Sequence, residues 1–179
     1  MKSLSMFFAV SFCAAAFLMP ACDTNAPSIE SAATEEANQN ASVEKNMNHY
    51  KQAWNDIINN RKLEAFNDKN FTTDVVVHTA TGDIKGIDSV QAYYANFITG
   101  FTDGKLIVND MFGQGDKLVK YWTFKGTHNG VFFGIPATNK TVSISGTTLV
   151  LFKDGKIAEE RDFFDNLELS QQLGLIPRQ

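Results

Sequence analysis

The sequence predicts a single α+β domain in which helices come first and a mostly antiparallel sheet follows. Apolar residues recur at helical spacing between residues 50 and 63 and again over 87–101. Farther along, apolar and polar residues alternate in long segments that are separated by glycine-containing turns and loops. Alternation with a period of two is typical of strands. Helices that precede a run of long antiparallel strands indicate the α+β class.

The first helices lie between residues 50 and 66. Tyr50, Trp54 and Ile58 fall on one helical face and predict the side that packs on the sheet. The pair Asn59-Asn60 predicts a break, after which a short second helix is expected to run through Phe66.

The remaining elements follow in order along the chain. A β-branched run at 75–79 predicts a short strand, which ends at Thr81-Gly82-Asp83. Residues 87–101 predict a helix with Tyr94 on its apolar side and an end near Gly100. Four strands are expected after this helix, at residues 105–112, 117–128, 140–152 and 156–164.

Residues 1–21 are typical of a signal peptide. Lys2 supplies a positive charge, and the uncharged apolar run at 6–18 is shorter than the ~20 residues that a membrane span needs. The run ends in Leu-Met-Pro-Ala-Cys, which is similar to a bacterial lipobox and makes Cys22 the expected lipidation site. The alternative is a secretory signal that is cleaved near Ala21. The lipobox reading predicts a lipid-anchored protein of the bacterial cell envelope, with the choice of inner or outer membrane left open.

A tether is expected between the anchor and the domain. Residues 22–43 are rich in Ala, Ser, Thr, Asn and Glu and contain no aromatic side chain. Such a composition buries little apolar surface, so we expect this lipidated segment to be disordered. Residues 44–179 are left for one domain with a sizeable core.

Cysteine usage and net charge restrict the function. The two cysteines are Cys13 and Cys22, so the mature domain has no cysteine for a disulfide, a thiolate nucleophile or a zinc site. The net charge of −4 and the pI near 5.3 come without a basic patch, which argues against nucleic acid as a partner.

Four motifs lie in a fixed order in the last third of the chain. They are Gly126-Thr127-His128 with Gly130, Gly134-Ile135-Pro136 followed by Thr138, Asp154-Gly155-Lys156-Ile157, and an acidic strand ending before Gln172-Leu173-Gly174. In this order the segment resembles the SnoaL-like polyketide cyclase family, within the nuclear transport factor 2-like superfamily. The resemblance implies a cone-shaped α+β barrel, in which a strongly curved sheet wraps around the N-terminal helices and leaves one deep pocket. It implies neither a metal nor a cofactor.

The resemblance also implies a catalytic residue. SnoaL-like cyclases use an aspartate on the final strand as the general acid/base for aldol ring closure. Asp162 matches this position, because it follows an arginine and lies three residues before Asp165 and twelve before Gly174. A carboxylate that loses water in an apolar cone can exchange a proton with a carbon acid near neutral pH. The other reading is a buried carboxylate held by Arg161 or by neighbouring hydroxyls.

The chain departs from the family opposite this aspartate. SnoaL-like cyclases have a histidine on the preceding strand, and this chain has Thr148, on the apolar face that the alternation over 140–152 predicts. A threonine hydroxyl can donate a hydrogen bond to an oxyanion, but it cannot act as an acid/base partner near neutral pH.

Four further side chains are expected near the ligand. His78 alternates with Val76 and is expected to share its buried face, and Trp122 and His128 share the apolar face of the strand at 117–128. Asp165 follows the final strand. The alternative for both histidines is a structural role in the fold.

Three functions stay open at this point. The first is acid/base chemistry by Asp162 on a small carbonyl compound or ester, of the cyclase, aldol or isomerase type and without a cofactor. The second is a lipoprotein that binds a small apolar or aromatic molecule without turnover. The third is a dimerisation module, whose pocket would be filled by Phe and Trp side chains. A homodimer through the sheet is also expected.

Overall fold

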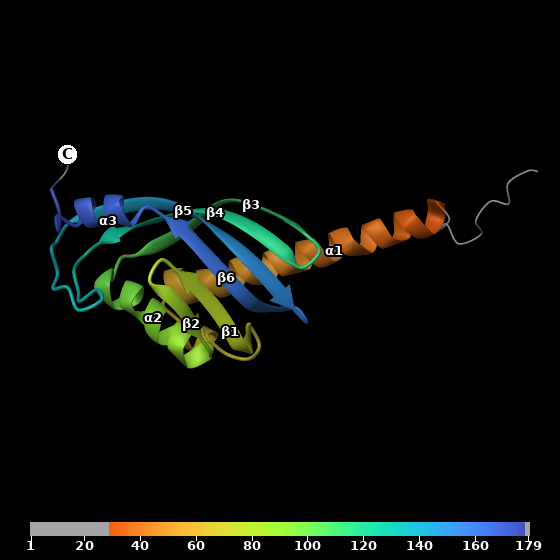
Figure 1. The fold of residues 1–179 in the computed structure, drawn as a ribbon, viewed down its shortest axis with the longest axis horizontal. Helices are drawn as coiled ribbons and strands as arrows, with labels where there is room; N and C mark the ends of the chain where they lie inside the picture. The colour runs from red at the N-terminus through yellow and green to blue at the C-terminus, as the bar shows by residue number, and fades with distance from the viewer. Residues whose placement is uncertain (1–28, 178–179) are drawn as a thin grey trace, which may run out of the picture.

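Six strands form one curved sheet, and the structure, a computed structural model, describes residues 29–177 (Figure 1). The strand order is β2-β1-β6-β5-β4-β3. Neighbouring strands are antiparallel except for β1 and β6, which are parallel. The sheet is open, with β2 and β3 at its edges, so the expected cone is curved but does not close into a barrel. The strands are β1 (Phe71–Thr79), β2 (Gly82–Lys85), β3 (Lys105–Gln114), β4 (Lys117–Thr127), β5 (Thr141–Lys153) and β6 (Lys156–Phe164).

Helices cover the inner face of this sheet. Helix α1 (Ile29–Trp54) runs into a π-helical turn (Asn55–Asn59), which ends where the asparagine pair predicts a break. A 3-10 turn (Leu63–Ala65) replaces the expected second helix. Helix α2 (Ile87–Gly100) lies beside β1 and β2 (Figure 1). The short α3 (Asn166–Gln172) lies along β5.

The core between helices and sheet is largely aromatic. The rings of Trp54 on α1 and Tyr94 on α2 lie edge to face, with centroids 4.6 Å apart. Phe66 stacks on both Phe71 and Tyr94. Edge-to-face and offset pairs of this kind add to the free energy that burial of the rings already supplies. The helices are therefore fixed on the sheet by interlocking rings, and the polar groups described below lie among these rings.

The tether expectation is wrong for residues 29–43, because α1 begins at Ile29. This stretch contains no Gly or Pro and is rich in Ala and Glu, which have high helix propensity. Side chains 33–42 are exposed, and Val43 is the first buried one. The helix therefore continues beyond the body of the domain without packing on it (Figure 1). The expected signal peptide and Cys22 lie outside the described residues.

Two elements escape the sequence prediction. β2 is only four residues long, and α3 follows the last strand directly. The Gln172 side chain of α3 accepts a hydrogen bond from the Ser143 N–H (2.6 Å) and donates one to the Ser143 carbonyl (3.1 Å). Its amide thus pairs with the backbone of β5 beyond the point where β6 ends. Within residues 29–177, no helix is long and apolar enough to cross a membrane.

The motif glycines serve close approach between segments. The N–H groups of Asn129 and Gly130 both donate to the Gly100 carbonyl at the end of α2. A Cβ at Gly130 would lie 2.1 Å from the Thr99 carbonyl oxygen, so only glycine fits there. The loop after β4 is therefore held against α2.

Candidate active site

A cavity of about 50 Å³, measured as room for the centres of water molecules, lies between the sheet and helices α1 and α2. Aromatic and aliphatic side chains form most of its wall. Its polar side chains are Lys120, Asp162 and the two tyrosines of α2. The lining residues are Trp54, Ile58, Tyr93, Tyr94, Phe97, Leu106, Lys120, Trp122, Phe124, Ile144, Asp162 and Phe164.

A larger hollow adjoins the cavity at the ends of β1 and β6. It measures about 640 Å³ on the same scale and shares Tyr93, Asp162 and Phe164 with the cavity. Asp162 therefore lies at the junction of the two spaces. A ligand with its bulk in the hollow can reach the small inner cavity with one functional group.

Three polar residues form a row across the inner face of the sheet. Lys120 on β4 pairs with Thr148 on β5, and Thr148 pairs with Asp162 on β6. Residues directly opposite one another on antiparallel strands have their Cβ atoms about 5 Å apart. Strand register alone thus brings a lysine, a hydroxyl and a carboxylate to one wall of the cavity.

Two hydroxyl groups hold the Asp162 carboxylate. Tyr94 Oη donates to Oδ2 (2.7 Å), and Thr148 Oγ1 donates to Oδ1 (2.5 Å). Trp122 Nε1 donates in turn to Thr148 Oγ1 (2.9 Å). Arg161 points the other way and donates to Glu159 (3.2 Å). Of the two partners considered from the sequence, the neighbouring hydroxyls hold Asp162 and Arg161 does not.

The absence of a side chain at Gly146 on β5 allows the Trp122 ring to pack where it does. Gly146 pairs with Trp122 across the two strands. A Cβ at position 146 would come within 2.4 Å of the indole ring. The ring therefore lies across Gly146, which lets its N–H reach Thr148.

A second buried carboxyl group lies on β6, two residues before Asp162. Glu160 accepts hydrogen bonds at Oε1 from Tyr50 Oη and from Trp54 Nε1 (3.0 Å), while Oε2 has no partner among the described residues. Burial, reinforced by the nearby charge of Asp162, raises the pKa of Glu160 to about 7. Glu160 can therefore hold or release a proton at neutral pH.

Lys120 is the most unusual residue of the inner face. It is 4% exposed, and its amine lies 5.0 Å from the centroids of both the Tyr50 and Trp54 rings. In the described part of the chain, no carboxylate oxygen lies within 4.0 Å of this amine. Burial lowers the pKa of Lys120, although Glu160 and Asp162 act in the opposite direction.

The tyrosines around these groups keep their protons. Burial is the main cause that raises the pKa of Tyr50 and of Tyr94, and the charges of Glu160 and Asp162 raise it further. Burial and the charge of Asp162 raise the pKa of Tyr93 to about 12. These phenols therefore stay donors at physiological pH.

Trp122 and Thr148 lie on the inner face, where the sequence places them. Thr148 is fully buried, and Trp122 forms part of the cavity wall. Both are within hydrogen-bonding reach of the Asp162 network.

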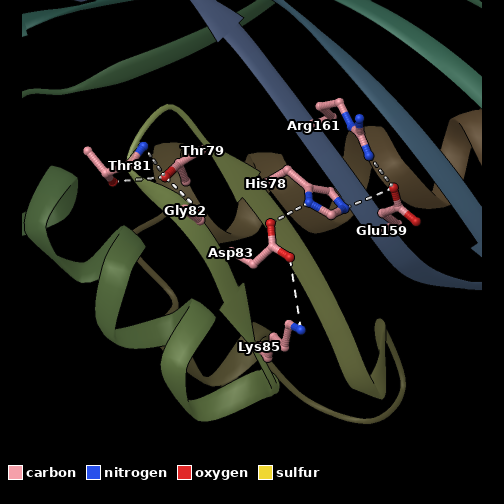
Figure 2. Close-up of polar contacts among 8 residues, drawn as sticks. All are labelled: His78, Thr79, Thr81, Gly82, Asp83, Lys85, Glu159 and Arg161. Carbon is pink, nitrogen blue, oxygen red and sulfur yellow. Dashed lines mark hydrogen bonds and ion pairs between the residues drawn. The ribbon is translucent and has the colours of Figure 1, made fainter.

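His78 does not face the inner cavity. On β1 the buried side chains are those of Phe71, Val75 and Val77, so His78 and Val76 project from the other face. The His78 ring contacts Asp83 of β2 (2.6 Å) and Glu159 of β6 (3.0 Å), as Figure 2 shows. The expected shared face with Val76 holds, but it is the outer one. His78 instead lines the outer hollow.

His128 and Asp165 are structural. His128 is fully buried, its Nδ1 accepts a hydrogen bond from the Thr138 N–H (3.3 Å), and its ring packs on Phe101 and Phe132, away from the cavity. Burial lowers its pKa. Asp165 is exposed and caps α3, because its carboxylate accepts from the Glu168 N–H (2.9 Å). The sequence prediction that these two residues line the pocket is therefore corrected.

Four side chains of the candidate site were not predicted as site residues from the sequence: Tyr50, Tyr94, Lys120 and Glu160. Lys120 lies between Leu118 and Trp122 on the apolar face of β4, so strand alternation alone points it inward. Glu160 shares its strand face with Asp162 for the same reason. Their charge conceals this signal, because Lys and Glu are rarely buried. Within the described residues there is no group of three or more side chains placed to hold a metal ion.

The curved sheet and the helices that cover it have the nuclear transport factor 2-like fold. The family model of the SnoaL-like polyketide cyclases matches residues 48–173. The chain belongs to this family. No curated protein matches the sequence significantly.

Solved structures share the fold at low sequence identity. A proposed SnoaL-like polyketide cyclase from Jannaschia sp. CCS1 is 20% identical with a TM-score of 0.69, over 75% of this chain and 95% of that one. AclR, a proposed hydroxylase from Streptomyces galilaeus, is 23% identical with a TM-score of 0.66, over 75% and 99%. TsrD from Streptomyces laurentii is 27% identical with a TM-score of 0.64, over 76% and 97%.

Proposed function

We propose that the domain carries out acid/base chemistry of the cyclase, aldol or isomerase type on a small carbonyl compound, with Asp162 as the proton-transfer group. The observation that carries this proposal is the position of Asp162, whose carboxylate lies at the junction of an apolar cavity and an outer hollow. Family membership supports the reaction class. The fold hosts several chemistries, so the assignment rests on the site.

In the proposed reaction Asp162 removes one proton from the substrate and later returns it. Asp162 takes a proton from the carbon next to the substrate carbonyl, and the resulting enolate attacks a second carbonyl group of the same molecule. The proton then returns to the new alkoxide, or to another carbon in an isomerisation. Tyr94 and Thr148 orient the carboxylate through their hydrogen bonds. General acid/base catalysis of this kind contributes about 10²–10⁴-fold to the rate.

The second candidate is binding without turnover. Thr148 occupies the position where the family has a histidine. Its hydroxyl already donates a hydrogen bond to Asp162 and so has no proton left to donate to a ligand. The inner cavity is also narrow, with aromatic side chains on most of its wall. Both observations favour a site that recognises a small apolar or aromatic molecule. The third reading is a module that serves dimerisation only, and it requires a pocket that side chains fill. The outer hollow argues against it, because that space is open.

Proton exchange distinguishes the first two candidates. Phenylacetone in D₂O reports loss of the proton next to its carbonyl by NMR, whether or not a ring closes. We expect the wild-type protein to accelerate the exchange of this proton for deuterium. In Asp162→Asn the rate enhancement should fall by a factor of at least about 10². Asp165→Asn is the matched control, since asparagine caps a helix as well as aspartate. Exchange that persists in Asp162→Asn contradicts the role of Asp162, and phenylacetone that binds wild type without exchange favours the binding candidate.

We also propose that the protein acts at the bacterial envelope, anchored by a lipid on Cys22. The support is the apolar run before the lipobox-like sequence and the lack of another cysteine in the mature chain. Polyketide intermediates form in the cytoplasm, so an exported protein is expected to act on a different carbonyl compound or ester. Mass spectrometry of the protein from a lipoprotein-processing bacterium should show a lipidated Cys22 at the N-terminus. An unmodified or uncleaved N-terminus contradicts the anchor.

A further inference from the structure

We propose that Lys120 is an amine nucleophile that forms an imine with the aldehyde or ketone group of a ligand in the inner cavity. The inference shares with the proposed function the premise that a carbonyl compound enters the site, but it does not depend on proton transfer by Asp162. It narrows the ligand class to aldehydes and ketones, since esters do not form imines.

The position of Lys120 is costly for a purely structural residue. Lysine is almost never buried unless it is paired, and the described chain places no carboxylate oxygen within 4.0 Å of this amine. An apolar side chain of similar size would fill the same space between Leu118 and Trp122 without the cost of removing an ammonium group from water. The chain nevertheless has an amine at the cavity wall.

The surroundings favour the neutral, nucleophilic amine. Burial lowers the pKa of Lys120, and buried lysines with a lowered pKa are the ones that form Schiff bases. Three aromatic rings surround the amine, with centroids at 5.0 Å (Tyr50), 5.0 Å (Trp54) and 5.8 Å (Trp122). The rings exclude water from the nitrogen and leave the cavity as its open side.

Two carboxyl groups lie on the same side of the sheet as Lys120 and can exchange protons with it. Glu160 and Asp162 both act on the charge of Lys120, and both share its side of the sheet. Glu160, with a pKa of about 7, can accept a proton from the amine through a bridging water molecule, since no carboxylate oxygen of the described chain lies within 4.0 Å of Nζ. Its Oε2, which has no partner among the described residues, is free to carry that proton.

The proposed step balances without an added reagent. The lone pair of Nζ attacks the carbonyl carbon, and a proton passes from the nitrogen to the carbonyl oxygen to give a neutral carbinolamine. A carboxyl group protonates its hydroxyl, which leaves as water through the outer hollow, and a protonated C=N bond to Nζ remains. The carbon next to this iminium is more acidic than the carbon next to the ketone. Asp162 is then positioned to remove its proton.

Reductive trapping tests the proposal directly. We would incubate the purified full chain at pH 7 with benzaldehyde and sodium cyanoborohydride, which reduces an imine to a stable secondary amine. Peptide mapping by mass spectrometry then reads the labelled lysines. A lowered amine pKa raises the neutral, reactive fraction at pH 7, so Lys120 should be labelled faster than exposed Lys117 and Lys125.

Matched variants make the result decisive. Lys120→Met should abolish the fast label, whereas Lys117→Met, on the same strand but exposed, should keep it. Because the mapping is read in the wild-type protein, the test holds even where Lys120→Met fails to fold. Label on surface lysines with none on Lys120 overturns the proposal and leaves Lys120 as an ammonium held by aromatic rings.

The two proposals fail separately. Fast labelling of Lys120 without exchange of phenylacetone supports the amine and contradicts proton transfer by Asp162. Exchange that depends on Asp162 while Lys120 stays unlabelled contradicts the amine and leaves the proposed function standing. Labelling of Lys120 in Asp162→Asn is expected, because that variant keeps the amine and its aromatic surroundings.

Discussion

Individual residues on the inner face of the sheet combine burial with charge. Lys120 on β4 and Glu160 and Asp162 on β6 all face inward. Thr148 donates a hydrogen bond to Asp162, and Trp54 donates one to Glu160. Burying such groups costs free energy unless hydrogen bonds or opposite charges offset it. Here the offset comes from Tyr50, Trp54 and Tyr94, whose polar atoms sit at the ends of large apolar rings. The same side chains thus build the core and hold the site.

The raised pKa of Glu160 predicts a pH-dependent stability. The folded state holds this proton up to about pH 7, while the unfolded chain releases it near the ordinary value of 4.5. The unfolded state therefore binds fewer protons in this window, and the free energy of unfolding falls as pH rises from about 4.5 to 7. Glu160→Gln removes this ionisation. Its stability relative to wild type should rise across the window, by on the order of 1–3 kcal/mol, and stay level above it.

Urea unfolding at pH 5 and pH 8 measures this difference. Glu44→Gln on the exposed side of α1 is the control and should change little between the two pH values. A constant offset for Glu160→Gln at both pH values would show that Glu160 does not titrate in this range.

At the scale of elements, sequence patterns locate the long strands within a few residues. β6 begins and ends where the alternation predicts, and β3, β4 and β5 differ by one or two residues at their ends. The inner faces of β4 and β5 also follow from alternation, which places Trp122 and Thr148 correctly. Short elements fail, because four residues of β2 carry no period and its pairing with β1 is decided by the turn.

Alternation along a strand defines two sets of side chains but does not say which set faces the core. The neighbouring elements that bury one of the two faces decide this. On β1 the sequence assigns the Val76 face to the core, but Val75 and Val77 are the buried residues. Three valines in a row give no alternation, so the choice depends on the sheet that β1 joins. The site residues that sequence reasoning missed have a similar cause, since hydropathy places Lys120 and Glu160 on the surface while their strand phase places them inside.

The exposed N-terminal part of α1 should be removable with little loss of stability. Side chains 33–42 are exposed, so deleting residues 23–42 should change the free energy of unfolding by no more than about 0.5 kcal/mol. Extending the deletion through Asn46 should cost more, because Val43 and Asn46 are buried. Thermal unfolding of the two deletions gives the comparison. A loss of several degrees with the shorter deletion would show that residues 23–42 pack on the domain or on a partner copy.

For the whole molecule, the outer face of the sheet is a surface that the proposed site does not explain. It carries an apolar patch that we call the outer-face patch, made of Ile107, Phe112, Tyr121, Leu149 and Phe163. Register brings these residues together: Phe112 and Leu149 flank Val119, and Tyr121 and Phe163 flank Thr147. Large contiguous exposed apolar patches mark interaction sites in many proteins. A sheet that faced only water would alternate apolar and polar residues here.

We propose that the outer-face patch joins two copies of the chain into a homodimer. A stable dimer buries about 800 Å² on each partner. The patch extends over four neighbouring strands of 9 to 13 residues, β3 to β6. Leu149 lies near the middle of the patch, between Val119 and Arg161. Leu149→Glu should therefore place two carboxylates in the interface and produce monomers, while the inner cavity keeps its lining.

Sedimentation at tens of micromolar protein compares this variant with a matched one. Leu167→Glu makes the same change at an exposed leucine of α3, outside the outer-face patch, and should leave the dimer intact. Wild-type protein that sediments as a monomer contradicts the proposal, as does a dimer that survives Leu149→Glu. Because the patch and the cavity lie on opposite faces of one sheet, the monomeric variant should retain reductive labelling of Lys120. Loss of that label on monomerisation would instead mean that the partner copy holds the sheet in the shape that the site requires.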